Sequence, residues 1–86
     1  MPCVCRFFGI AIYIYFDDHA PPHFHAKYAD REALYEIETL RIYRGGLPAR
    51  AHGLVLQWAD MHRTELTDNW QRAQEHRETV PIQPLD

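Results

Sequence analysis

The spacing of apolar residues changes near Leu47, from an alternation typical of strands to a recurrence every three to five residues typical of a helix. Before that point, turn residues separate short segments rich in β-branched and aromatic residues, at 7–16, 23–29, 33–38 and 40–43. After it, one apolar stripe continues to Ala73. This order predicts an α+β domain, in which an antiparallel sheet of three to four strands, within about residues 4–44, is followed by one long helix.

The predicted helix, about residues 48–75, is longer than such a sheet. It would measure roughly 42 Å, whereas six-residue strands span about 20 Å. Its far end carries Leu66 and Trp70, and leaving such side chains in water forgoes roughly 1.5 to 3 kcal/mol each. We therefore predict a homodimer or a small partner protein that covers Leu66, Trp70 and, in an extended tail at 77–86, Ile82 and Leu85. A kinked helix that folds Leu66 and Trp70 back on the sheet is the alternative.

Length and charge limit the class of protein. A chain of 86 residues supports a single domain, 1–86, with a small core. Its net charge of -3 provides no general attraction for nucleic acid, so RNA is not the favoured partner. The longest apolar run is half of a membrane span, so we expect no membrane association and a cytoplasmic protein, in which Cys3 and Cys5 are reduced.

Three of the six histidines lie within the seven residues 19–25, and these are the leading candidates for chemistry. His23 and His25 project from the same side of an extended chain, so both can meet one ligand. A divalent transition metal, zinc or nickel, would take these two rings with His19, Asp17 or Asp18 as a third ligand. The alternative is a surface pair of histidines bonded to a tyrosine or a helix carboxylate.

The same face offers a second interpretation. His23, His25 and Lys27 share it with two tyrosines, Tyr13 and Tyr15, a set that suits a small ribonuclease or a platform for single-stranded RNA. The alternative is a half-solvated face, or the seat of the helix. A zinc site that adds Cys3 and Cys5 is excluded unless the first strand doubles back at Gly9.

The remaining candidates favour structural roles. Trp58 and Trp70 are expected to be core anchors, and His62 a core histidine in preference to a third ligand. Surface positions are expected for His52 and His76. Solvated side chains are favoured over an anion site for Arg41, Arg44 and Arg50.

Several strings carry a resemblance to a known family. They are RFFGI at 6–10, FDDHAPPHFHAKY at 16–28, LPAR at 47–50, WADMH at 58–62, EL at 65–66, Trp70 and IQPL at 82–85. In these residues the chain resembles the small bacterial family catalogued as domain of unknown function 4160. The resemblance implies a stand-alone bacterial protein, often encoded beside another small protein, as in toxin-antitoxin-like pairs.

Taken together, these features predict an accessory binding module of a two-protein, toxin-antitoxin-like system, with the His-rich turn as its functional site. The alternative is a small ribonuclease or a metal-dependent hydrolase that uses His23 and His25. Catalytic candidates are His23, His25 and Lys27, and candidate metal ligands are His19, His23, His25 and Asp18.

Overall fold

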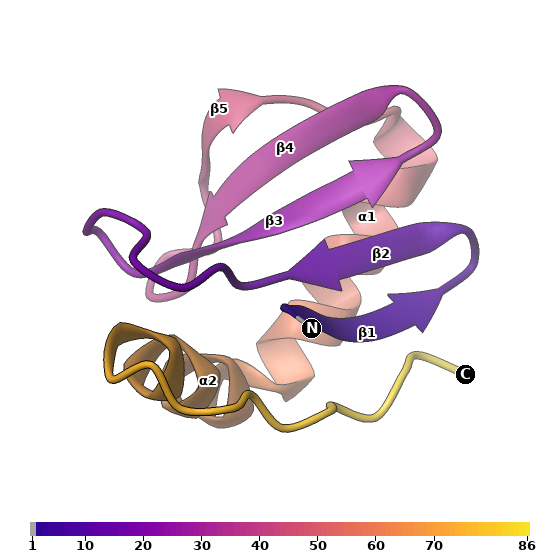
Figure 1. The fold of residues 1–86 in the computed structure, drawn as a ribbon. Helices are drawn as coiled ribbons and strands as arrows, with labels where there is room; N and C mark the ends of the chain where they lie inside the picture. Colours follow the sequence, from indigo (N-terminus) through magenta and orange to yellow (C-terminus); the bar gives the residue numbers. More distant parts are fainter. Residues whose placement is uncertain (1) are drawn as a thin grey trace.

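The computed structural model describes residues 2–86 and has an α+β fold (Figure 1). Five antiparallel strands follow one another in the sheet in chain order: β1 (Cys3–Phe7), β2 (Ile10–Tyr13), β3 (His23–Tyr28), β4 (Arg31–Glu36) and β5 (Ile42–Gly45). Two helices follow, α1 (Ala49–Met61) and α2 (Arg63–Gln74). The fold class expected from the sequence is confirmed. The expected three to four strands and single helix are wrong in number.

The apolar run at 7–16, predicted as one strand, turns back on itself. Phe8 and Gly9 form the turn between β1 and β2, with φ angles of 48° and 79°. This is the left-handed region, which glycine adopts without the steric cost that a side chain brings. The run therefore crosses the core twice, and each passage is only four or five residues long.

The long helix is broken at His62, where φ is -129° and ψ is 27°. In Figure 1, α1 crosses behind the sheet and α2 turns to lie beside its edge, next to the loop between β2 and β3. Leu66 and Trp70 are buried in the chain's own core as a result. The alternative of a kinked helix is therefore confirmed, and the uncovered overhang on which the predicted partner rested is wrong.

The core lies between α1 and one face of the sheet. Trp58 of α1 packs its ring 5.2 Å from Phe7 and 6.1 Å from Phe24, and Phe24 stacks on Tyr35 of β4. Because side chains alternate along a strand, the burial of Phe24 turns His25 of β3 toward the opposite face. The candidate residues of β3 therefore lie on the face away from α1.

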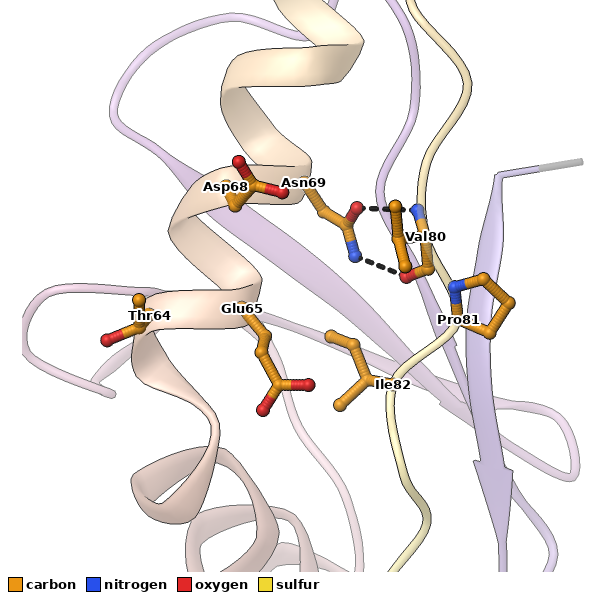
Figure 2. Close-up of a pocket in the computed structure, with 7 residues that line it drawn as sticks. All are labelled: Thr64, Glu65, Asp68, Asn69, Val80, Pro81 and Ile82. Carbon is orange, nitrogen blue, oxygen red and sulfur yellow. Dashed lines mark hydrogen bonds between the residues drawn. The ribbon is translucent and has the colours of Figure 1, made fainter.

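The C-terminal tail lies against the body of the same chain. The buried side chain of Asn69 accepts a hydrogen bond from the Val80 N–H and donates one to the Val80 carbonyl, both at 2.8 Å (Figure 2). Further along, the Ile82 N–H donates to the carbonyl of Val4 in β1. Beside this contact, residues of α2 and of the tail line a pocket of about 310 Å³. No helix within residues 2–86 is long and apolar enough to cross a membrane.

Candidate functional site

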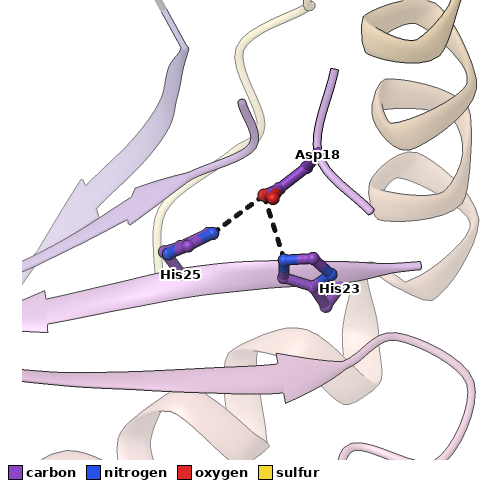
Figure 3. Close-up of side chains that lie close together, drawn as sticks. All are labelled: Asp18, His23 and His25. Carbon is purple, nitrogen blue, oxygen red and sulfur yellow. Dashed lines mark hydrogen bonds and ion pairs between the residues drawn. The ribbon is translucent and has the colours of Figure 1, made fainter. Parts of the chain in front are cut away.

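Asp18, His23 and His25 form a cluster on the sheet face opposite α1 (Figure 3). Their candidate ligand atoms all lie within 4.8 Å of one another. The two histidines come from the start of β3, and the loop that precedes the strand folds back so that Asp18 lies over both rings. His23 is buried, and His25 and Asp18 are half-buried.

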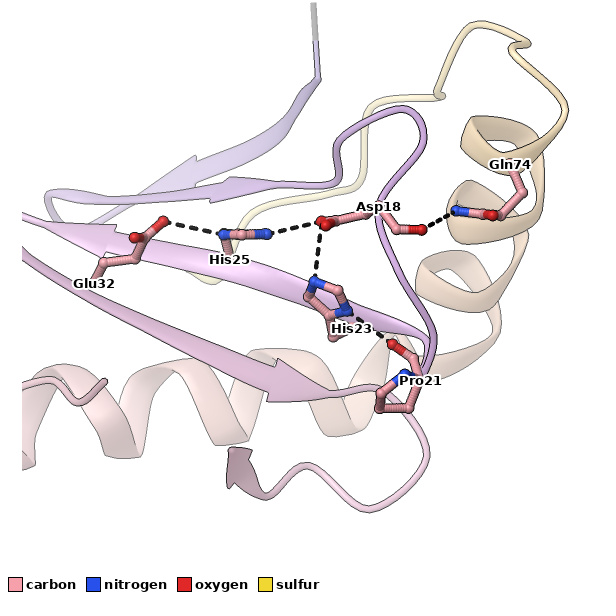
Figure 4. A network of polar contacts seen from close by, with 6 residues as sticks. All are labelled: Asp18, Pro21, His23, His25, Glu32 and Gln74. Carbon is pink, nitrogen blue, oxygen red and sulfur yellow. Dashed lines mark hydrogen bonds and ion pairs between the residues drawn. The ribbon is translucent and has the colours of Figure 1, made fainter. Parts of the chain in front are cut away.

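The His25 ring lies between two carboxylates. Its Nε2 is 2.9 Å from Oδ2 of Asp18, and its Nδ1 is 3.1 Å from Oε2 of Glu32 in β4 (Figure 4). A neutral imidazole has only one N–H, so it can donate to only one of them. The other nitrogen then presents a lone pair to a carboxylate, unless a proton or another cation lies between them.

The His23 ring also has a nitrogen that faces a carboxylate, and this ring is more deeply buried. Its Nδ1 is 2.8 Å from the carbonyl oxygen of Pro21, which only accepts, so Nδ1 carries the proton and donates. Its Nε2 lies 3.0 Å from Oδ2 of Asp18 but has no hydrogen-bond partner within the described chain. A neutral His23 thus aims a buried lone pair at a carboxylate oxygen, an arrangement that needs a cation.

Asp18 is held as a carboxylate. Burial by itself would raise its pKa, but the hydrogen bond from His25 and the charges of His23 and His25 together hold the pKa below its ordinary value. The backbone is held as well, because Nε2 of Gln74 in α2 donates to the Asp18 carbonyl at 3.0 Å (Figure 4). An anionic oxygen therefore stands between the two rings at neutral pH.

Aromatic rings surround the two histidines. The Trp70 and Tyr43 rings each lie 5.2 Å from that of His23, and the Tyr15 ring meets His25 edge-on at 4.7 Å. Burial is the main cause that raises the pKa of Tyr43, so its hydroxyl stays neutral through physiological pH. These rings give the polar cluster an apolar surround that excludes part of the solvent.

The other predicted ligands lie outside the cluster. The side chain of His19 is exposed, and Asp17 pairs with His76 at 2.8 Å. The chain does double back at Gly9, yet Cys5 lies in the core and neither cysteine belongs to the cluster. His62, half-buried, contacts Trp58 instead.

Lys27 extends over the rings of Tyr13 and Tyr15, so the predicted grouping of His23, His25 and Lys27 with these tyrosines is found. Arg41, Arg44 and Arg50 are exposed, as expected for solvated residues. The sequence interpretation missed Glu32, Pro21 and Gln74. Glu32 faces Lys27 across the hairpin between β3 and β4, so strand register is the one signal that points to it.

The residues expected at a partner surface are covered by the chain itself. Leu66, Trp70 and Ile82 are 0%, 7% and 5% exposed within the single chain, and Leu85 is half-buried against the core. The unburied apolar surface that suggested a partner at these positions is therefore absent from residues 2–86.

Fold and site define a class: a small α+β domain that carries a His-His-carboxylate cluster on the open face of an antiparallel sheet. The chain belongs to the family described as Domain of unknown function (DUF4160), whose family model matches residues 9–71. The matched region includes all three residues of the cluster. No curated protein and no solved structure matches the chain significantly.

Proposed function

We propose that the protein is a metal-dependent hydrolase whose Asp18, His23 and His25 hold one divalent transition-metal ion, zinc or nickel. One observation carries the proposal. Each histidine presents Nε2 to the same carboxylate oxygen, while an acceptor on the opposite side engages its Nδ1.

That pattern is typical of metal-ligating histidines. Such a ring almost always donates its other N–H to a carboxylate or a backbone carbonyl, which fixes the tautomer and aims the free nitrogen at the metal. Glu32 plays this part for His25, and the Pro21 carbonyl plays it for His23.

The distances also suit a metal. Zinc binds histidine nitrogen and carboxylate oxygen at about 2.0–2.2 Å, so neighbouring ligand atoms of a tetrahedral centre stand roughly 3.4 Å apart. The Nε2 atoms lie 2.9 and 3.0 Å from Asp18 Oδ2, a few tenths of an ångström less than that separation, and all three ligand atoms lie within 4.8 Å of one another. Three protein ligands leave a position open for water, as in catalytic zinc sites. A bound ion would lower the pKa of that water to about 7 and so supply hydroxide for hydrolysis.

A competing account places a proton, and no metal, on His23. It would bury an imidazolium that is 2% exposed, beside the ring of Trp70, with one shared carboxylate as its counter-ion. Burying such a charge is costly unless it is well paired, and His25 shares the same oxygen. The two accounts predict different metal contents: one ion per chain for the metal site, and none for a protonated His23.

The test is metal analysis of protein purified without an affinity tag. We expect about one equivalent of zinc or nickel after dialysis against the metal, and a melting temperature higher than that of chelator-treated protein. At a metal concentration 100 times Kd the gain is about 2.7 kcal/mol, or roughly 10–20 °C for a domain of this size.

His25→Ala and Asp18→Asn should each lose most of the metal, whereas His19→Ala, an exposed histidine one residue from Asp18, is the matched control and should keep it. Less than a tenth of an equivalent in the unmodified protein would contradict the metal site. Equal loss in His19→Ala would contradict the ligand assignment. Metal binding without turnover of p-nitrophenyl acetate or bis(p-nitrophenyl) phosphate would leave a binding site and remove the hydrolase.

The role as accessory module of a two-protein system stays a prediction. A partner would have to use residues other than Leu66, Trp70 and Ile82, since these are buried in the chain itself. Of the surfaces predicted from the sequence, only the His-rich turn then remains as a contact for such a partner.

A further inference from the structure

Two tyrosines of β2 and the loop after it extend the candidate centre across the open sheet face. The Tyr13 and Tyr15 rings are parallel, with centroids 5.7 Å apart and 5° between their planes. Tyr15 also contacts His25 edge-on. Both rings are half-buried, so part of each remains accessible. Aromatic side chains of this kind on a sheet face are stacking surfaces for unpaired bases.

Cationic side chains stand on both sides of the centre. Lys27 places Nζ 4.9 Å from the Tyr13 centroid, and Arg6 of β1 donates from Nη2 to the Tyr13 hydroxyl at 3.4 Å. On the other side, Arg44 of β5 stands opposite Leu34, which itself stands opposite His25. At about 4.8 Å between strands, the row from Tyr13 to Arg44 spans roughly 14 Å. The row is therefore longer than a single phosphate group could occupy.

The charges on this face balance only without a metal. The cations Arg6, Lys27 and Arg44 are matched by the carboxylates of Asp18, Glu32 and Glu36, the last of which lies opposite His23. A divalent ion at the centre would leave the face with a net charge of about +2. The net charge of -3 for the whole chain therefore does not decide how this surface meets an anion.

We propose that the substrate of this centre is a single-stranded nucleic acid, with bases stacked on Tyr13 and Tyr15, backbone phosphates on Lys27, Arg6 and Arg44, and one phosphodiester at the metal. The proposal rests on the proposed function. Hydrolysis there joins the oxygen of water to phosphorus and breaks one P–O ester bond, and the proton that the water gives up ends on the departing alkoxide. A small phosphate ester without a base would have no group to stack on Tyr13 and Tyr15.

The test measures fluorescence anisotropy of labelled 12-nucleotide strands with zinc-loaded and with chelator-treated protein. Single-stranded RNA, DNA of the same sequence and duplex RNA are compared at low salt. We expect a single strand to bind, the duplex to bind at least tenfold more weakly, and chelation to weaken binding at least tenfold. Comparison of the two single strands shows whether the protein prefers ribose or deoxyribose, that is, RNA or DNA.

Variants then locate the surface. Tyr15→Leu should weaken binding at least about fivefold, the lower end for loss of one stacked base. Lys27→Gln should reduce the slope of log affinity against log salt by about 0.7, as expected for one lost phosphate contact on a single strand. Arg50→Gln, an equal charge change on α1 across the sheet, is the matched control and should change neither quantity. The zinc content of every variant is measured in parallel.

The outcomes separate the two proposals. Full zinc occupancy with no affinity for either single strand overturns this inference and leaves the metal centre intact. Absence of zinc from the unmodified protein overturns the proposed function. Equal affinity for the duplex, or equal effects of Lys27→Gln and Arg50→Gln, overturns the inference, because binding would then follow overall charge and not this surface.

Discussion

Asn69→Ala should release the C-terminal tail. The side chain is 1% exposed and makes two 2.8 Å hydrogen bonds with the backbone of Val80, as a neighbouring strand would (Figure 2). A net 0.5–1.5 kcal/mol for each lost bond gives about 1–3 kcal/mol. Ile82, buried two residues further on, would lose part of its packing as well. For a domain of this size, the melting temperature should fall by roughly 5–20 °C.

Two measurements check this. Urea unfolding followed by tryptophan fluorescence gives the free energy of unfolding, and limited trypsin digestion tests whether cleavage after the exposed Arg77 becomes faster. Thr67→Ala, on an exposed position of the same helix, is the control and should change stability by less than about 0.5 kcal/mol. A free energy of unfolding within about 0.5 kcal/mol of that of the unmodified protein, with cleavage at an unchanged rate, would refute the reasoning.

Two further predictions follow from burial. Trp70→Glu should abolish the folded state, because it removes a large ring from the hydrophobic core and puts a carboxylate in its place. Circular dichroism checks this, and a folded variant that differs only in oligomeric mass would contradict it. Burial raises the pKa of the Cys5 thiol to about 11, so at pH 8 it stays protonated and shielded in the folded chain. A thiol-specific chromogenic reagent should therefore label Cys3 first and Cys5 only on unfolding, and two equally fast equivalents would show that Cys5 is accessible.

Periodicity was enough to predict the class of fold, but not the points at which the chain reverses. The run at 7–16 has no polar interruption, and its turn places Phe8, a residue with a side chain, in the left-handed region. Turn prediction relies on Gly, Pro, Asn, Asp and Ser, and here it had only Gly9. The break at His62 lacks proline and glycine altogether, so only the mismatch between helix length and sheet length indicated it.

Part of the candidate site was also open to prediction. Alternation along the strand is sufficient to put His23 and His25 on one face. The choice of Asp18 over Asp17 or His19 depends on how the loop folds, and contacts from the other end of the chain fix that fold. Gln74, 56 residues away, holds the Asp18 carbonyl. No local pattern reports such a contact.

The break at His62 links the stability of the fold to the assembly of the centre. Because the chain turns there, α2 brings Trp70 onto the ring of His23 and Gln74 onto the backbone of Asp18. The apolar surface that the sequence left without cover thus becomes a wall of the candidate site. Trp70, which the sequence suggested as a partner contact, instead packs within the chain against a candidate metal ligand. Asn69, by holding the tail against α2, then stabilises the helix that completes the cluster.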